Sequence, residues 1–167
     1  TPLYSSAASD VYKRQHEYIV EEVDRLNGIL TDYLLFSRDE PGRRHPMDLG
    51  ATLRRSVRLV EESFAEAGVR VETRIPGDGA PFEGEEKKLQ QCFLNCMLNA
   101  RQAMDGGGEL AVDLREAGNS WALSFTDTGP GIPAGDRLRV FEPFYTTRQN
   151  GSGLGLSIVR RVIEDHG

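Results

Sequence analysis

The sequence predicts an α+β fold, a two-layer α/β sandwich in which helices cover one face of a mostly antiparallel sheet, preceded by a long coiled-coil-like helix. Four stretches carry apolar residues at every third or fourth position, as amphipathic helices do. Three shorter stretches alternate apolar and polar residues, as half-buried strands do. Because each kind of element must bury its apolar side, helices stacked on a sheet satisfy both.

The composition is that of an ordinary globular domain with an acidic balance. Of the 167 residues, 38% are apolar and 28% are charged, and the net charge is -6. An acidic balance argues against a nucleic-acid partner. No apolar stretch reaches the roughly 18 residues that cross a bilayer, and no signal-peptide layout opens the chain. With Cys92 and Cys96 expected to be reduced core residues, we expect a cytoplasmic location.

Four segments follow one another along the chain. Residues 1–15 lack periodicity, and we expect a disordered or artificial leader. Residues 16–38 carry a heptad seam, typical of a helix that needs partner helices, with a core helix of its own domain as the alternative. Residues 39–48 suit a linker, and 49–167 form the main domain. The seam consists of Ile19, Val23, Leu26, Leu30 and Tyr33.

The main domain alternates helical and strand patterns. A connection as long as the Gly- and Pro-rich segment that runs to about residue 152 is typical of a lid or binding loop. The predicted elements are a helix at 53–67, a strand at 69–75, a turn at 76–79, a helix at 85–104, a hairpin of strands at 110–114 and 121–125, a helical turn at 137–141 and a last helix from residue 156.

Asp127 continues the alternation of 121–125, which places its carboxylate on the inward face of the sheet. An unpaired buried carboxylate costs several kcal/mol, so we expect it to meet a donor. Gly129 and Gly131 follow at once and let the backbone approach a flat ligand such as a base closely. An aspartate that merely opens a turn at the strand end explains the same residues equally well.

Asn95 and Asn99 lie one helical turn apart on the same face, with Gln102 alongside. An amide oxygen suits a hard cation, and Mg²⁺ keeps most of its shell as water and phosphate oxygens, so Asn99 alone is a sufficient anchor. A solvated polar stripe is the alternative.

Residues 146–156 combine glycines and hydroxyls directly before the last helix. Free amides and the helix dipole at such a place form a cradle for phosphate. The run is neither a Walker A loop nor a Rossmann fingerprint, and a merely flexible loop is the alternative.

Taken in order, the boxes at 89–104, 127–133, 141–148 and 151–156 resemble the N box, first glycine box, F box and second glycine box of two-component sensor histidine kinases, whose Bergerat-type domain binds ATP. Residues 16–38 resemble the second helix of that family's dimerisation and phosphotransfer hairpin. The wording NARQAM and EPFYTT is closest to nitrogen-regulation-type kinases.

This resemblance implies roles for single residues. Asn99 is the implied Mg²⁺ ligand, Asn95 a nearby polar contact, and Asp127 the acceptor of the adenine amino group. Arg148 stands where these kinases commonly have lysine. The implied cofactors are ATP and Mg²⁺, and the implied partners are a histidine-bearing helical domain of the parent chain, a response regulator and a second copy of the protein. The residues implied to line the base pocket are Gly129 and Gly131. The hydrophobic hinges implied for the lid are Phe141 and Phe144. The residues implied for the lid and the phosphate side of the site are Thr146, Thr147, Arg148, Gly151, Gly153, Leu154, Gly155 and Leu156.

Three departures from the family pattern qualify the resemblance. No phosphoacceptor box precedes the seam, and His16 is at the wrong position to replace it. The sequence stops before the family's last strands, so we expect a catalytic domain truncated at its C-terminus, with an exposed sheet edge. Without the acceptor helix, no catalytic base is assigned.

Other function classes fit less of the sequence. Related Bergerat-fold ATPases place a glutamate four residues before the metal-binding asparagine to activate water, and Asn95 holds that position here. The Asp-Thr-Gly at 127–129 also matches half of an aspartic protease site, but that leaves the other boxes unexplained. A nucleotide-binding module that is inactive in this fragment is the third alternative.

Overall fold

The computed structural model describes residues 43–148 and 151–167. The predicted leader at 1–15, the coiled-coil-like helix at 16–38 and the first part of the predicted linker lie outside the described residues. Within the two described ranges, none of the helices combines the length and apolar character that crossing a membrane requires.

The main sheet contains β2 (Val69–Arg74), β4 (Gly108–Ala117) and β5 (Ser120–Asp127), in the order β2-β4-β5. β4 and β5 form the predicted antiparallel hairpin, whereas β2 runs parallel to β4. A second sheet pairs β1 (His45–Asp48) with β3 (Pro81–Gly84) in antiparallel register. Two of the three strand pairings are therefore antiparallel, and the predicted α+β class is confirmed.

Strand β1 occupies the last four residues of the segment that was predicted as a linker, 39–48. Strand β3 lies between the predicted turn and the predicted helix, where no strand was expected. Each has only four residues, which is too short for a clear alternation, and each contains a proline, which the sequence pattern assigns to turns. Asp48 ends β1 and caps the next helix, because its carboxylate accepts from the backbone N–H of Ala51 at 3.0 Å. The same oxygen also accepts from the N–H of Ala80, directly before β3, at 3.1 Å.

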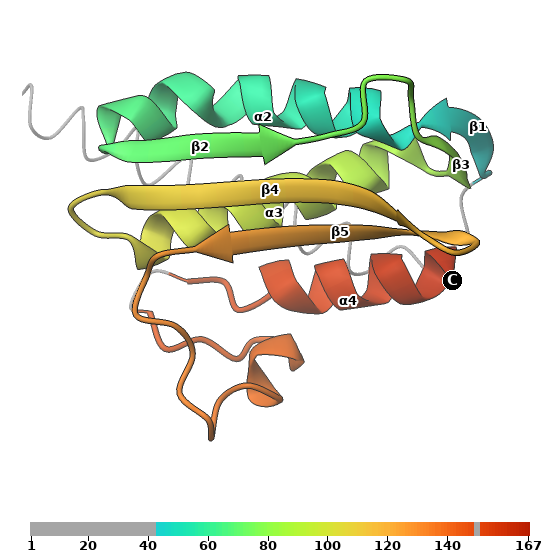
Figure 1. Cartoon of the computed structure of the whole chain (residues 1–167). Coiled ribbons are helices and arrows are strands. Elements are labelled where there is room, and N and C mark those ends of the chain that lie inside the picture. The colour runs from blue at the N-terminus through green and yellow to red at the C-terminus, as the bar shows by residue number, and fades with distance from the viewer. Residues whose placement is uncertain (1–42, 149–150) are drawn as a thin grey trace, which may run out of the picture. The chain divides into compact units, whose positions relative to one another are not determined.

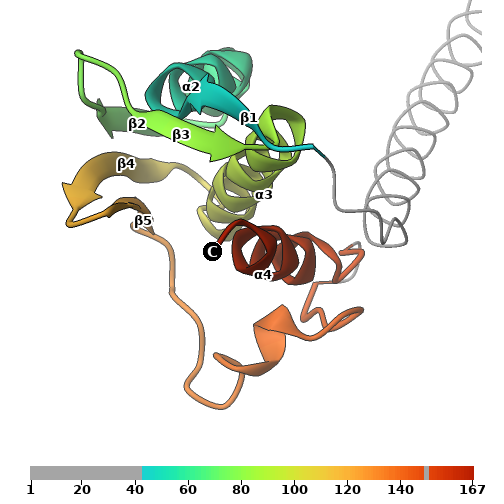
Figure 2. The ribbon, with the colours of Figure 1, turned by 90° about the vertical axis from the view of Figure 1, so that its right-hand side faces the viewer.

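Three helices cover one face of the sheet, as Figures 1 and 2 show. They are α2 (Leu49–Glu66), α3 (Glu86–Ala103) and α4 (Gly155–His166). α2 packs on β2 and on α3, α3 packs on β4 and β5, and α4 packs on α3. The largest fully buried side chains of this core are those of Phe64, Phe93, Leu53, Met97, Leu110, Leu154 and Val112.

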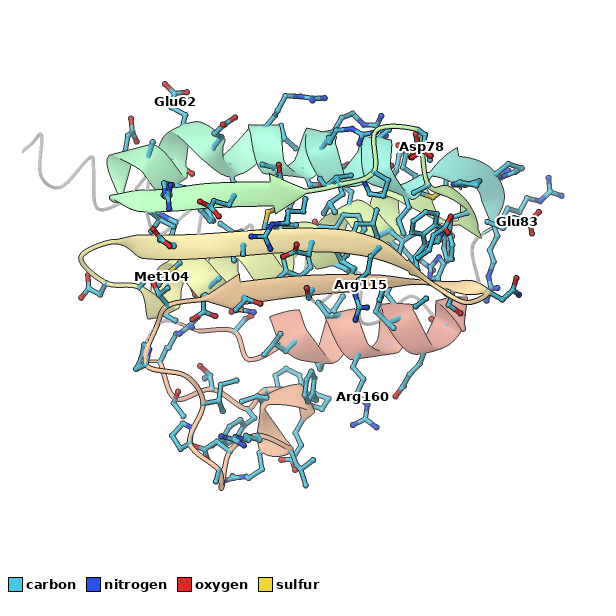
Figure 3. All side chains as sticks on the ribbon, in the orientation of Figure 1. Glu62, Asp78, Glu83, Met104, Arg115 and Arg160 are labelled. Carbon is cyan, nitrogen blue, oxygen red and sulfur yellow. The ribbon has the colours of Figure 1, made fainter. Side chains whose placement is uncertain are left out.

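Three elements of the domain end or begin at the same end of the sheet. β5 ends there, α3 ends there beside Met104, and α4 begins there, as Figures 1 and 3 show. The segment that joins β5 to α4 extends away from the sheet, below α4 in Figure 1. It contains the short 3-10 helix η1 (Arg139–Phe141), where a helical turn was predicted. Sequence stretches far apart in the chain therefore meet at one edge.

Candidate functional site

Asp127 closes β5 on the face that carries the core. It pairs in register with Leu110, which is fully buried, so both side chains point to the helical side of the sheet. The side chain of Asp127 itself is exposed, because the burial of β5 decreases toward its end. The predicted face is right, but the expectation of a buried carboxylate that must be neutralised is wrong.

Gly129 brings the chain back tightly against both Asp127 and α3. Its N–H donates to Oδ1 of Asp127 at 2.9 Å, the Asx turn of the alternative explanation. A Cβ at Gly129 would lie 2.8 Å from that oxygen and 3.2 Å from Cβ of Ala103. Within 43–148 and 151–167, Oδ2 of Asp127 has no hydrogen-bond partner, so turn formation and an outside donor are compatible.

Gly131 is required for a different reason from Gly129. A Cβ there would meet nothing within 4 Å, but the residue has φ +73°, a backbone conformation that favours glycine. The two glycines thus let the chain leave β5, touch the end of α3 and turn away.

Asn95 lies buried between α3 and α4 rather than on a solvated stripe. Its Nδ2 donates to the carbonyl oxygen of Gly155 at 3.3 Å, and its Oδ1 accepts from Nε2 of Gln91 at 3.1 Å. Both ends of the amide are engaged, so its observed contacts tie α3 to the start of α4.

Asn99 is half-buried and faces a cation. Nη1 of Arg148 donates to Oδ1 of Asn99 at 3.2 Å, and Nη2 donates to the backbone oxygen of the same residue at 3.2 Å. Nη1 also donates to Oε1 of Gln102 at short range. The side-chain oxygen of Asn99 is therefore accessible to a positively charged group.

The start of α4 offers unsatisfied donors beside these asparagines. The helix begins at Gly155 without a side-chain cap, and the first amides of any helix lack intrahelical acceptors. A Cβ at Gly155 would lie 3.8 Å from Nδ2 of both Asn95 and Asn99. The open amide end and its dipole thus adjoin Asn99, an arrangement suited to an anion with an accompanying cation.

The residues before α4 form a tight turn on the F-box segment. Gly153 has φ +67°, and its carbonyl oxygen accepts from the N–H of Phe144 at 2.9 Å. A Cβ at Gly153 would lie 2.5 Å from the carbonyl carbon of Phe144. Phe144 itself has φ +66° and is 64% exposed, so it does not anchor the segment in the core.

The other predicted site residues of this segment differ in exposure. Thr146 and Thr147 are exposed, and Oγ1 of Thr146 accepts from the N–H of Arg148 at 3.1 Å. Gly151 packs against Thr146. The side chain of Leu154 is buried in the core, so only its backbone can contact a ligand, and that of Leu156 is half-buried.

Two features of this site have no signal in the sequence pattern. The first is the packing of Ala103 against the turn after β5, and the second is the contact of Arg148 with α3. Each joins residues far apart in sequence, and no local pattern signals such a contact.

The residues of this site lie in a stretch of the chain that matches a known protein family. Residues 84–167 match the family model described as histidine kinase-, DNA gyrase B-, and HSP90-like ATPase. The signal transduction histidine-protein kinase AtoS of Escherichia coli K12 is 27% identical over 98% of this chain. The sensory histidine kinase/phosphatase NtrB of Rhizobium leguminosarum is 33% identical over 89% of it. The chain spans 27% of AtoS and 43% of NtrB, so it matches less than half of either relative.

Solved structures agree with the fold. The nucleotide-free catalytic domain of histidine kinase ThkA superposes with a TM-score of 0.70 at 26% identity, covering 75% of this chain and 82% of that domain. Full-length ShkA in complex with AMPPNP superposes with a TM-score of 0.73 at 27% identity, covering 91% of this chain and 34% of ShkA. ThkA in complex with the response regulator protein TrrA superposes with a TM-score of 0.70 at 26% identity, covering 89% of this chain and 43% of the matched chain.

Proposed function

This chain belongs to the family of histidine kinase-, DNA gyrase B- and HSP90-like ATPases, and we propose on that premise that residues 49–167 are the ATP-binding catalytic domain of a sensor histidine kinase. The proposed reaction transfers the γ-phosphate of ATP to a histidine on a helical dimerisation domain in two-component signalling. One observation carries the proposal: the end of β5, which holds Asp127, the last turns of α3, which hold Asn99, and the uncapped start of α4 lie at one end of the sheet.

The proposed nucleotide site divides into a base end and a phosphate end. At the base end, Oδ2 of Asp127 accepts from the adenine amino group while Oδ1 holds the turn through Gly129, and Gly131 lines the pocket. At the phosphate end, the amides at the start of α4 and the guanidinium of Arg148 bind anionic oxygens. Backbone and hydroxyl groups assigned to the same end belong to Thr146, Thr147, Gly151, Gly153, Leu154, Gly155 and Leu156.

Asn99 is the residue proposed to hold Mg²⁺. The guanidinium on its side-chain oxygen indicates that this oxygen is placed to face a positive charge, which fits a single protein ligand of a cation otherwise coordinated by water and phosphate. Mg²⁺, when bound, neutralises charge on the phosphates.

The proposed transfer needs positioning more than covalent chemistry from this domain. A bond forms between the acceptor imidazole nitrogen and the γ-phosphorus, and the bond from phosphorus to the bridging oxygen breaks, with its electron pair leaving on ADP. The domain orients the γ-phosphate through Asn99 and the start of α4.

Asn95 favours transfer to histidine over hydrolysis. A water-activating base must accept a proton, and an amide does not. The amide of Asn95 is also buried and bonded at both ends. This observation supports a kinase over the related ATPases.

The proposed partners follow from the relatives. ThkA forms a complex with a response regulator, and we propose a response regulator as the final phosphate acceptor here. We also propose a homodimer of the parent protein, formed through the helix expected at 16–38, and a cytoplasmic position, since the site requires ATP.

The decisive experiment incubates the full 167-residue chain with γ-labelled ATP and a separately supplied acceptor hairpin bearing the phosphorylatable histidine. Label on the hairpin histidine is expected. Release of free labelled phosphate without label on the hairpin would support the ATPase alternative, and neither product would support an inactive nucleotide-binding module. A hairpin with His→Gln at the acceptor is the control for specific transfer.

A further inference from the structure

A single arginine bridges the segment before α4 and the last turns of α3. Nη1 and Nη2 of Arg148 reach the side-chain and backbone oxygens of Asn99, each at 3.2 Å, and Nη1 also reaches the side-chain oxygen of Gln102. All three acceptors lie near the C-terminal end of α3, where the helix dipole favours a cation. The contact thus has both geometric and electrostatic support.

This contact uses the oxygen that the proposed function assigns to Mg²⁺. A bound Mg²⁺ lies about 2.0–2.1 Å from its oxygen ligands. A guanidinium 3.2 Å from the same oxygen of Asn99 would then stand within a few ångströms of a dication and be repelled by it. The Arg148–Asn99 bond and a metal on Asn99 therefore compete for the same oxygen.

We propose that Gln102 and Asn99 form a latch that holds Arg148 against α3 in the nucleotide-free protein and keeps the side-chain oxygen of Asn99 occupied until phosphates draw the arginine away. The proposal rests on the proposed function, and it assigns Gln102 as a positioning residue. Phosphate oxygens are charged and accept two parallel bonds from a guanidinium, so they compete well with amide oxygens. Because nucleotide binds only the unlatched protein, the closed latch reduces the apparent nucleotide affinity in proportion to the unlatched fraction.

The first test uses no nucleotide. Phenylglyoxal modification of each arginine is followed by mass spectrometry in the full chain, with exposed Arg58 as the internal reference. Gln102→Ala is expected to speed modification of Arg148 about two- to fivefold relative to Arg58, the effect of one lost hydrogen bond to a charged group near the surface. Gln90→Ala, the same change nearer the start of α3, leaves the rate unchanged. Equal rates in wild type and Gln102→Ala overturn the latch.

The second test measures the dissociation constant of Mg–AMPPNP by calorimetry. Gln102→Ala is expected to bind about two- to fivefold more tightly, because the arginine is already released. Unchanged binding overturns the latch, because the bond from Arg148 to Gln102 then does not lower nucleotide affinity. Weaker binding also overturns it, because Gln102 then contacts the nucleotide itself. A wild-type chain that binds no nucleotide overturns the proposed function instead, and the modification rates still report on the arginine contact.

Discussion

The amide nitrogen of Asn95 donates to the carbonyl oxygen of Gly155 at 3.3 Å, so a buried side chain in α3 fixes the first residue of α4. Gly155 also begins the helix whose open amides face the proposed phosphates. This one bond therefore links the packing of the core to the geometry of the site.

Asn95→Ala is expected to lower the free energy of unfolding by about 1–3 kcal/mol, because it leaves the carbonyl of Gly155 and the amide of Gln91 without their partner. Urea unfolding followed by circular dichroism measures the loss. Asn99→Ala is the matched control, since Asn99 is only half-buried, and its effect is expected within about 0.5 kcal/mol. Equal losses in both variants would contradict the structural role of Asn95.

Nucleotide binding is expected to depend on Asn99 and Asp127 separately. Asn99→Ala removes the proposed metal anchor and Asp127→Ala the proposed acceptor for adenine, so each abolishes measurable Mg–AMPPNP binding in calorimetry. Asn119→Ala in the β4–β5 turn and Asp78→Ala, which Figure 3 places at the opposite end of the domain, are controls of the same residue types. Unchanged affinity in both site variants would refute the nucleotide assignment.

The elements with long periodic patterns could be predicted from sequence. The helices at 86–103 and 155–166 and the hairpin of β4 and β5 match their predicted positions closely, because each repeats its pattern over many residues. The strands β1 and β3 were missed since four residues that include a proline give no such signal. The parallel pairing of β2 with β4 depends on contacts far apart in the chain.

The candidate site was predicted less completely than the fold. Alternation correctly placed Asp127 on the inner face but not its exposure, which depends on how far the helical layer extends. Helical spacing put Asn95 and Asn99 on one face. The packing of α4 makes them different, because Asn95 is buried in a bond to Gly155 whereas the side-chain oxygen of Asn99 stays accessible. The contact of Arg148 with Asn99 joins residues 49 positions apart and has no local signature.

Gly153 is expected to tolerate alanine less well than Gly131. Both have positive φ, which costs an L-residue roughly 1–2 kcal/mol, but only at Gly153 would the added Cβ also meet the backbone of Phe144, at 2.5 Å. Thermal unfolding of Gly153→Ala should show the larger loss, and Mg–AMPPNP binding should weaken with it. Gly77→Ala, with open space and no positive φ, is the control. A loss at Gly153 no greater than at Gly131 would contradict this account.

Asp48 is expected to make stability depend on pH in the acid range. The hydrogen bond from the backbone N–H of Ala51, helped by Ala80 and Arg54, holds the pKa of its carboxyl below the ordinary value of 3.8 despite the opposing effect of desolvation. A carboxyl with a lowered pKa in the folded state contributes stability at pH values above its unfolded pKa, and this contribution disappears as the pH falls through the folded value.

The matching measurement is urea unfolding of wild type, Asp48→Ala and Asp48→Asn from pH 7 to pH 2. At pH 7, Asp48→Ala is expected to lose about 1 kcal/mol through the missing helix cap. Asp48→Asn keeps a capping side chain without a titrating charge, so it should lose less at pH 7 and approach wild type as the pH falls below 3.8. A difference between wild type and Asp48→Asn that stays constant over the whole range would show that the charge of Asp48 does not contribute, because a neutral cap would then account for the whole effect.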